Sequence, residues 1–288
     1  MYVVLGATGK LGGLVVEALM AQGVAAADVL ATGRNSAALH DLQSRGVRTA
    51  SVAYDDVDAL PKALDGADAV LLISGSEPGK RVQHHRNVVD AAKAVNVGHL
   101  VYTSVPDARR TGLFLAPDHK ATEEYIEQQA IPATILRNNF YTEGFLGDFD
   151  KARELGVIAN SVGDGRTASA TRADFAEAAA RALLRRDYDG EVLELGGDDA
   201  WSYAEFASTA SDVLGRPVEY RPLTPDEEAA ALRAQGLPEA TIQRMALRAE
   251  AIRRGDVDAR SNDLSGLLGR ETAPLAETMR AWHLRQPR

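Results

Sequence analysis

Hydrophobic and polar positions follow two alternating patterns through the first half of the chain. Short apolar runs, of which "ADAVLLIS" (67–74) is almost continuous, are typical of parallel strands that are covered on both faces. Between these runs, apolar residues recur at helical spacing, as at Leu11, Leu14 and Ala18. The predicted strands cover residues 2–5, 28–33, 47–53, 67–74, 99–104 and 133–137, and the predicted helices cover 11–22, 36–45, 57–64, 79–95 and 118–130. Strands and helices that alternate with short connections predict an α/β fold with a doubly wound parallel sheet.

The pattern loosens after residue 140. A strand over 191–196 is expected to rejoin the sheet, and the remaining periodic segments are helical, at 225–234, 238–254 and 274–284. We predict a dinucleotide-binding domain over residues 1–150, its sheet rejoined by 172–197, and a smaller, mostly helical C-terminal lobe over 151–288. Ligands of doubly wound sheets bind at the carboxyl edge of the strands, so we expect the lobe to cover that edge.

Composition excludes several classes of function. The chain has 288 residues and a formal net charge of −9, which argues against general binding to nucleic acid or anionic membranes. It has no cysteine, which excludes disulfides, thiolate catalysis, iron–sulfur clusters and cysteine-ligated zinc. No apolar run reaches the roughly 20 residues of a membrane helix, and no targeting segment precedes the first strand. We therefore expect a cytoplasmic protein that binds neither nucleic acid nor membrane.

A glycine-rich loop, "GATGKLG" (6–12), joins the first strand to the first helix. The spacing of Gly6, Gly9 and Gly12 suits a dinucleotide-binding loop: a sharp turn, close approach to a pyrophosphate and close packing of helix on strand. The amino end of the helix then offers free N–H groups and a partial positive charge to the anion. The alternative is an ordinary strand–turn–helix junction. A P-loop is excluded because Lys10 is not followed by Ser or Thr.

Arg34 indicates which dinucleotide is bound. An NAD-specific site places an acidic residue at the end of the second strand, where it binds the ribose 2′-hydroxyl. This chain has Gly33 and Arg34 there, and a guanidinium can bind a 2′-phosphate. We predict NADP(H) rather than NAD(H). The alternative is a solvated arginine at a helix start.

The catalytic pair of ordinary short-chain dehydrogenases is missing. Those enzymes use Tyr-x-x-x-Lys as a proton donor, and no lysine of this chain has a tyrosine four residues before it. The helix where that pair should lie instead carries His119 and, one turn later, Glu123. An alcohol–ketone dehydrogenase or a sugar epimerase of the usual kind is therefore not expected.

Several short motifs, taken in order along the chain, carry a family resemblance. They are "GATGKLG" (6–12), "GRN" (33–35), "LLISGSE" (71–77), "HHRNVVDAAKAV" (84–95), "YTS" (102–104), "LRNNFYTE" (136–143), "GDGRTASATRADFA" (163–176), "LLGR" (267–270) and "LAETM" (275–279). With them the chain resembles the NmrA-like atypical short-chain dehydrogenase/reductase family, and within it the bacterial NADPH-dependent quinone oxidoreductases. The resemblance implies an NADPH-binding Rossmann domain, a small C-terminal domain and a quinone pocket between them.

The resemblance also implies site residues. Cofactor contacts are expected from Gly6, Ala7, Thr8, Gly9, Lys10, Leu11, Gly12, Arg34, Ile73, Ser74, Gly75, Arg86, Thr103, Asn138, Asn139, Phe140, Tyr141 and Arg172. Gly6 to Leu11 and Arg34 would face the phosphates and adenosine, and Ile73 to Gly75 the pyrophosphate and nicotinamide ribose. Asn138 to Tyr141 would flank the nicotinamide and the quinone.

Quinone reduction fits the missing proton donor. The product is an aromatic hydroquinone, so the acceptor needs less acid catalysis than a ketone, and the protein chiefly has to orient the reactants. We predict a flavin-independent, two-electron transfer of hydride from NADPH. The candidate catalytic donors to the substrate oxygen are Asn138, Asn139, Tyr141 and His119.

These donors have structural alternatives. Asn138 and Asn139 follow a strand and can cap a turn through their side-chain amides. His119 and Glu123 can form a pair on a helix surface. No third ligand is evident near that pair, so we predict no metal site.

Two further polar clusters have open roles. His84 and His85 stand at a polar helix start and are expected to be solvated or next to the cofactor. Thr103 and Ser104 end a strand, where they either contact the substrate or satisfy backbone groups.

Other functions stay open at this point. NmrA-like proteins include regulators that bind NADP(H) without catalysis and act on a protein partner, and the missing Tyr-x-x-x-Lys is compatible with that role. A reductase of another activated double bond or of an azo compound would use the same hydride chemistry. The sequence also leaves open whether the protein forms a homodimer.

Overall fold

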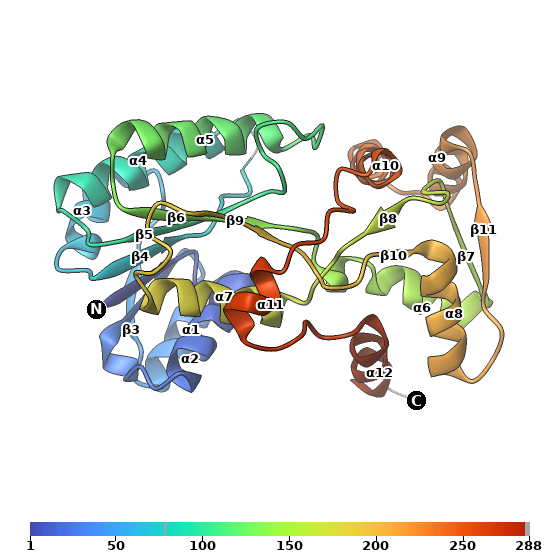
Figure 1. The fold of residues 1–288 in the computed structure, drawn as a ribbon, viewed down its shortest axis with the longest axis horizontal. Coiled ribbons are helices and arrows are strands. Elements are labelled where there is room, and N and C mark those ends of the chain that lie inside the picture. Colours follow the sequence, from blue (N-terminus) through green and yellow to red (C-terminus); the bar gives the residue numbers. More distant parts are fainter. Residues whose placement is uncertain (78, 286–288) are drawn as a thin grey trace.

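The computed structural model describes residues 1–77 and 79–285 and is built on a seven-stranded parallel sheet. The strands, in spatial order, are β3 (Arg48–Ser51), β2 (Val29–Gly33), β1 (Tyr2–Leu5), β4 (Ala69–Leu72), β5 (Leu100–Ser104), β6 (Ala133–Asn138) and β9 (Val192–Leu195). Chain order reverses between the neighbouring strands β1 and β4 (Figure 1). In a doubly wound sheet, the ligand crevice is expected at the carboxyl ends of these strands. The predicted parallel sheet is confirmed, and β9 extends it beside β6.

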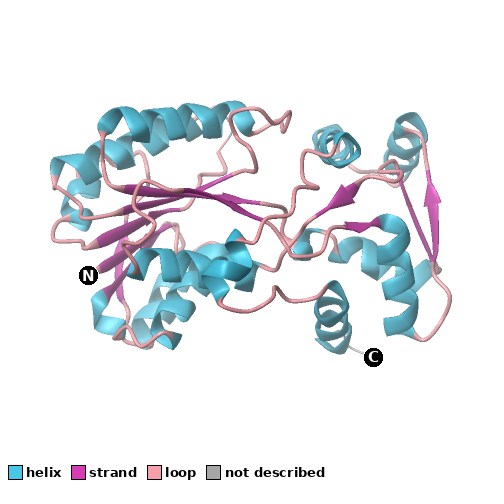
Figure 2. Cartoon of the chain, viewed as in Figure 1, coloured by secondary structure: helices cyan, strands magenta, loops and turns pink. Residues whose placement is uncertain are grey.

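Helices cover both faces of this sheet, as Figure 2 shows. One face carries α3 (Ala59–Leu64), α4 (Arg81–Ala94) and α5 (Ala116–Gln129), and the other carries α1 (Lys10–Ala21), α2 (Ser36–Ser44), α7 (Arg172–Leu184) and α11 (Asp263–Leu268). Alternate residues of each strand enter the two layers: Val4 of β1 joins the α1–α7 cluster, and its neighbours Val3 and Leu5 join the α4–α5 cluster. Burial on both faces explains the continuous apolar runs of the central strands.

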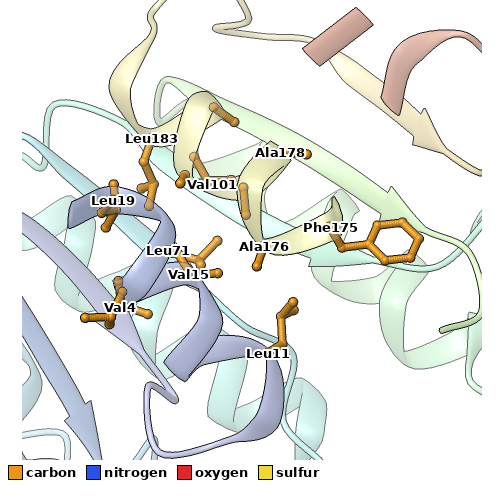
Figure 3. Packing of buried hydrophobic residues seen from close by; sticks show 14 of the residues in the cluster. Val4, Leu11, Val15, Leu19, Leu71, Val101, Phe175, Ala176, Ala178 and Leu183 are labelled. Carbon is orange, nitrogen blue, oxygen red and sulfur yellow. The ribbon is translucent and has the colours of Figure 1, made fainter. Parts of the chain in front are cut away.

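Small side chains let α7 lie close to α1. Ala176, Ala178 and Leu183 of α7 share one buried cluster with Val15 and Leu19 of α1 (Figure 3). Helix α11 adds its buried leucines to the same cluster. Residues from the second half of the chain therefore complete a layer that the first half begins.

The remaining residues form a lobe beyond the carboxyl edge of the sheet (Figure 1). Its elements are α6 (Leu146–Leu155), β7 (Val157–Asn160), β8 (Arg166–Thr167), β10 (Trp201–Ser202), α8 (Tyr203–Leu214), β11 (Glu219–Pro222), α9 (Pro225–Ala234), α10 (Glu239–Arg254) and α12 (Leu275–Arg285). An aromatic cluster around Phe145, Trp201, Tyr203 and Phe206 forms its core. The pairs β8–β10 and β7–β11 were not predicted, because these strands are only two to four residues long and show no apolar alternation. In the described residues, no helix has the length and apolar character needed to cross a membrane.

Candidate functional site

The carboxyl ends of β1, β2, β4 and β5 surround a crevice of about 480 Å³. It is lined by Gly6, Thr8, Gly9, Lys10, Leu11, Gly12, Gly33, Arg34, Val52, Ala53, Tyr54, Asp55, Ile73, Ser74, Gly75, Ser76, Glu77, Arg81, His84, Thr103, Leu115, Tyr141 and Arg172. Most of the residues predicted to contact a cofactor are therefore gathered along one continuous wall.

The glycine loop forms the first part of that wall, and its shape depends on glycine. Gly6 has a φ of +79°, in the left-handed region, and a Cβ on Gly12 would lie 2.4 Å from the Gly6 carbonyl oxygen. A Cβ on Gly33 would similarly lie 2.3 Å from Thr8 Oγ1. Gly9 precedes α1 without any side-chain cap, and the first turn of α1 has no acidic residue. The amino end of α1 therefore offers N–H groups to an anion, as a dinucleotide loop requires.

Arg34 stands at the β2 end of the crevice. Its side chain is 67% exposed and forms an ion pair with Glu77 from the opposite rim, which Lys80 also approaches at 3.4 Å. Hydrogen bonds from Arg34 and Lys80 hold the pKa of Glu77 below its usual value. A 2′-phosphate bound by Arg34 would take the place of this carboxylate as its counterion.

The middle of the crevice is formed by residues 73–75, which follow β4 without regular secondary structure. Tyr54 donates a hydrogen bond to the Ile73 carbonyl at 2.7 Å, and Thr103 Oγ1 accepts one from the Ser74 N–H at 2.9 Å. Thr103 thus satisfies a backbone group and lines the crevice at the same time. Tyr54 was not predicted from the sequence as a site residue, because no sequence pattern distinguishes a tyrosine that follows a weakly apolar strand.

Tyr141 and Arg172 form the end of the crevice opposite Arg34, since β1, β4 and β5 separate β2 from β6. The Arg172 guanidinium lies over the Tyr141 ring at 4.9 Å from its centroid. The other side of that ring meets Phe175 edge to face. Burial raises the pKa of Tyr141, so the phenol stays protonated at neutral pH and can donate a hydrogen bond.

The neighbouring asparagines do not line the crevice. Asn139 accepts a hydrogen bond from the Phe140 N–H at 2.7 Å and donates one to the Val257 carbonyl at 3.1 Å. Its amide therefore stabilises the turn after β6 and links it to residue 257. Phe140 packs with Phe145 against the core of the lobe. Asn138 is buried, and within residues 1–77 and 79–285 neither polar atom of its amide has a partner.

His119 is also outside the crevice. It is 2% exposed, and its Nδ1 lies 2.8 Å from the Tyr102 hydroxyl. Burial, followed by the charge of Arg81, lowers the pKa of His119 to about 3, so the imidazole is neutral at physiological pH.

The alternative of a surface pair between His119 and Glu123 is contradicted by the structure. Glu123 is itself 2% exposed, accepts a hydrogen bond from Ser104 at 2.6 Å and pairs with Arg137. Helix α5 turns these residues toward the sheet, where strand side chains provide their partners.

Three other predicted positions lie differently from what the sequence indicated. His84 and His85 are buried, because this side of α4 packs into the fold, so the solvated alternative is wrong. His84 does line the crevice, as the alternative of a place next to the cofactor expects. Arg86 does not line the crevice: its guanidinium lies over the ring of Tyr125 on α5, 5.0 Å from the centroid. Ala7 belongs to the hydrophobic core behind the loop.

The whole chain, and not only the crevice, is similar to known proteins. The model of the NmrA-like family matches residues 2–258. The chain is 40% identical to quinone oxidoreductase 2 of Escherichia coli (strain K12), over 97% of both chains. The crystal structure of an E. coli NADPH-dependent quinone oxidoreductase in complex with NADPH superposes with a TM-score of 0.93, over 99% of this chain and 100% of that one, at 40% identity. The triphenylmethane reductase of Citrobacter sp., solved with NADP(H), has a TM-score of 0.90 at 33% identity over 98% of this chain and 99% of that one.

Proposed function

Because the chain belongs to the NmrA-like family, we propose that its crevice binds NADPH and that the protein is an NADPH-dependent oxidoreductase that reduces quinones. One observation carries this conclusion. A single crevice joins the glycine loop and the Arg34 guanidinium to a polar aromatic end at Tyr141, in a chain that is similar over nearly its whole length to an NADPH-dependent quinone oxidoreductase.

The residues along the crevice fit NADPH. Close packing of Gly12 against the main chain of Gly6 and Ala7 gives the loop its shape, and the uncapped amino end of α1 suits the pyrophosphate. Arg34 would hold the 2′-phosphate, the 73–75 segment would lie along the nicotinamide ribose, and Tyr141 with Arg172 would border the nicotinamide. When bound, NADPH supplies a hydride from its nicotinamide ring.

Among the predicted donors, Tyr141 suits the reaction best. The quinone takes up one hydride from NADPH and one proton from solvent to give a hydroquinone. Its oxygen needs only a hydrogen-bond donor as negative charge develops there. Tyr141 lines the crevice and keeps its proton, whereas Asn139 and His119 are engaged elsewhere. We assign Tyr141 as the donor and leave Asn138, with its unpartnered amide, as a second polar group near the same end.

The two parts of the chain have separate tasks in this proposal. Residues 1–150, with the segment 172–197, would hold NADPH, and the rest of residues 151–288 would cover the substrate side. A cytoplasmic location and a homodimer also stay predictions, which cell fractionation and light scattering of the purified protein would test.

The test follows the absorbance of NADPH when purified protein is mixed with a panel of benzoquinones and naphthoquinones. We expect oxidation of NADPH that depends on the quinone and requires no added flavin. A triphenylmethane dye and an azo dye serve as comparison acceptors, because a reductase of triphenylmethanes shares this fold. Tight NADPH binding without turnover of any acceptor would contradict the enzyme assignment and favour a regulator.

A further inference from the structure

The 73–75 segment is held almost entirely by side chains from other elements. Besides the bonds from Tyr54 and to Thr103, the Gly75 N–H donates to His85 Nε2 at 2.9 Å, and Arg81 Nε donates to the Gly75 carbonyl at 2.6 Å. Both His85 and Arg81 are buried residues of α4. A segment without regular structure is thus fixed at both polar groups of Gly75.

The hydrogen-bond network behind His85 determines where its proton lies. Thr122 donates its hydroxyl proton to the Asp118 carbonyl at 2.9 Å, and its oxygen lies 2.9 Å from His85 Nδ1. The hydroxyl has only one proton, so Nδ1 must donate and Nε2 must carry the lone pair that accepts from Gly75. Only the neutral Nδ1–H tautomer satisfies both contacts. Burial is the largest cause that lowers the pKa of His85, to about 3, so the imidazole stays neutral at neutral pH.

Arg81 completes the arrangement. Its Nη1 binds Asp118 at 2.7 Å, so α5 supplies the carboxylate that orients the guanidinium toward Gly75. The Ser74–Gly75 peptide is trans, so the Ser74 carbonyl points away from the imidazole that binds the Gly75 N–H. The lone pair of His85 Nε2 therefore holds the Ser74–Gly75 peptide in one orientation. Both Ser74 and Gly75 line the crevice.

We propose that His85 is a positioning residue of the NADPH site: as an obligate hydrogen-bond acceptor, it sets the orientation of the Ser74–Gly75 peptide against which the dinucleotide binds. This inference rests on the proposed function. It assigns His85 a role that does not require contact with the cofactor or the substrate.

The test compares His85→Gln with His85→Asn. The Gln amide oxygen reaches about as far as Nε2 and can accept from Gly75, whereas the shorter Asn amide reaches only the Nδ1 position. We expect His85→Asn to raise the Kd for NADPH about tenfold, since a buried N–H loses its acceptor, and His85→Gln to stay within about threefold of wild type. Amide hydrogen exchange at Gly75 in the protein without NADPH should speed up in His85→Asn and stay slow in His85→Gln.

His99→Asn is the matched control. His99 is also buried and lies 2.9 Å from Thr134 Oγ1, but, unlike the Gly75 partner of His85, neither Thr134 nor its other neighbour Asp189 lines the crevice. This variant should lose thermal stability without a change in NADPH affinity. If His85→Asn does not fold, Thr122→Val removes the acceptor of the Nδ1 proton and should weaken NADPH binding about threefold.

Equal NADPH affinities of His85→Asn and wild type would overturn the proposal, as would equal weakening in His85→Asn and His85→Gln, which would mean that packing alone matters. Unchanged affinity in Thr122→Val would likewise contradict it. A wild-type protein that binds no NADPH would instead overturn the proposed function itself. The Gly75 exchange rates separate the two failures, because they are measured without the cofactor.

Discussion

The two ends of the crevice are built in different ways. The end proposed to hold the phosphates is made of one contiguous loop, 6–12, whose main chain would bind the ligand, together with Arg34, which follows β2. The opposite end is assembled from Thr103, Leu115, Tyr141 and Arg172, side chains from four distant parts of the sequence. The shape of the first end depends on the main chain, and neither Gly12 nor Gly33 has room for a Cβ. The second end depends on contacts between side chains that the fold brings together. Substitutions should therefore act on stability and affinity at the first end, and on rate at the second.

The largest effect is expected from Gly12→Ala. The new Cβ would lie 2.4 Å from the Gly6 carbonyl oxygen and 2.6 Å from Ala7 Cα, and main-chain atoms cannot move aside as a side chain could. We expect a loss of about 3 kcal/mol in the free energy of unfolding and no measurable NADPH binding. Urea denaturation and NADPH fluorescence titration measure the two effects.

Gly13→Ala is the control for this change. Its Cβ would lie 3.6 Å from the Ala7 carbonyl oxygen, an ordinary contact, so the helix should gain roughly 0.5–1 kcal/mol. If Gly12→Ala were as stable as Gly13→Ala, close packing at the loop would not be what requires glycine.

Arg34→Ala should have the next largest effect. Loss of a charge-assisted contact to the 2′-phosphate is expected to raise the Kd for NADPH roughly 10- to 100-fold, and that for NADH by less than about threefold. Arg45→Ala, which removes an arginine paired with Glu17 outside the crevice, should change neither constant. Similar losses for both cofactors in Arg34→Ala would mean that Arg34 does not read the 2′-phosphate.

Tyr141→Phe tests the opposite end. The ring and its contact with Arg172 remain, so the KM for NADPH should hold, whereas loss of one hydrogen bond to the substrate oxygen should lower kcat about tenfold. His119→Gln should leave kcat within about twofold of wild type, because His119 bonds to Tyr102 behind the crevice. The reverse ranking in steady-state kinetics would make His119 the donor.

The smallest effect is expected from Glu77→Gln. Removing the carboxylate that pairs with Arg34 frees the guanidinium for the 2′-phosphate and should tighten NADPH binding about threefold, less so at high salt. Titrations at two ionic strengths measure it. Weaker binding would show instead that Glu77 holds Arg34 in a useful orientation.

The same contrast explains what the sequence could predict. The loop, its glycines and strands such as β1 and β4 are local patterns, so their places were predicted to within a few residues. The buried pairing of Glu123 with Arg137 depends on a strand that lies next to α5 only in the folded chain, which made a surface pair the natural reading of helical spacing. The positioning role of His85 could not be predicted for the same reason, because its partner Thr122 lies 37 residues away in the sequence.

The late position of α7 in the chain has a consequence for synthesis. Until residues 172–184 have left the ribosome, Leu71 and Val101 lack the helix that shares their buried cluster, as do Val15 and Leu19 of α1. A nascent chain ending near residue 150 should therefore expose a wide apolar surface and depend on chaperones, although it already contains the glycine loop and every strand of the main sheet except β9. Pulse proteolysis of stalled nascent chains would test this: resistance should appear only in chains that include α7, and resistance at residue 150 would contradict it.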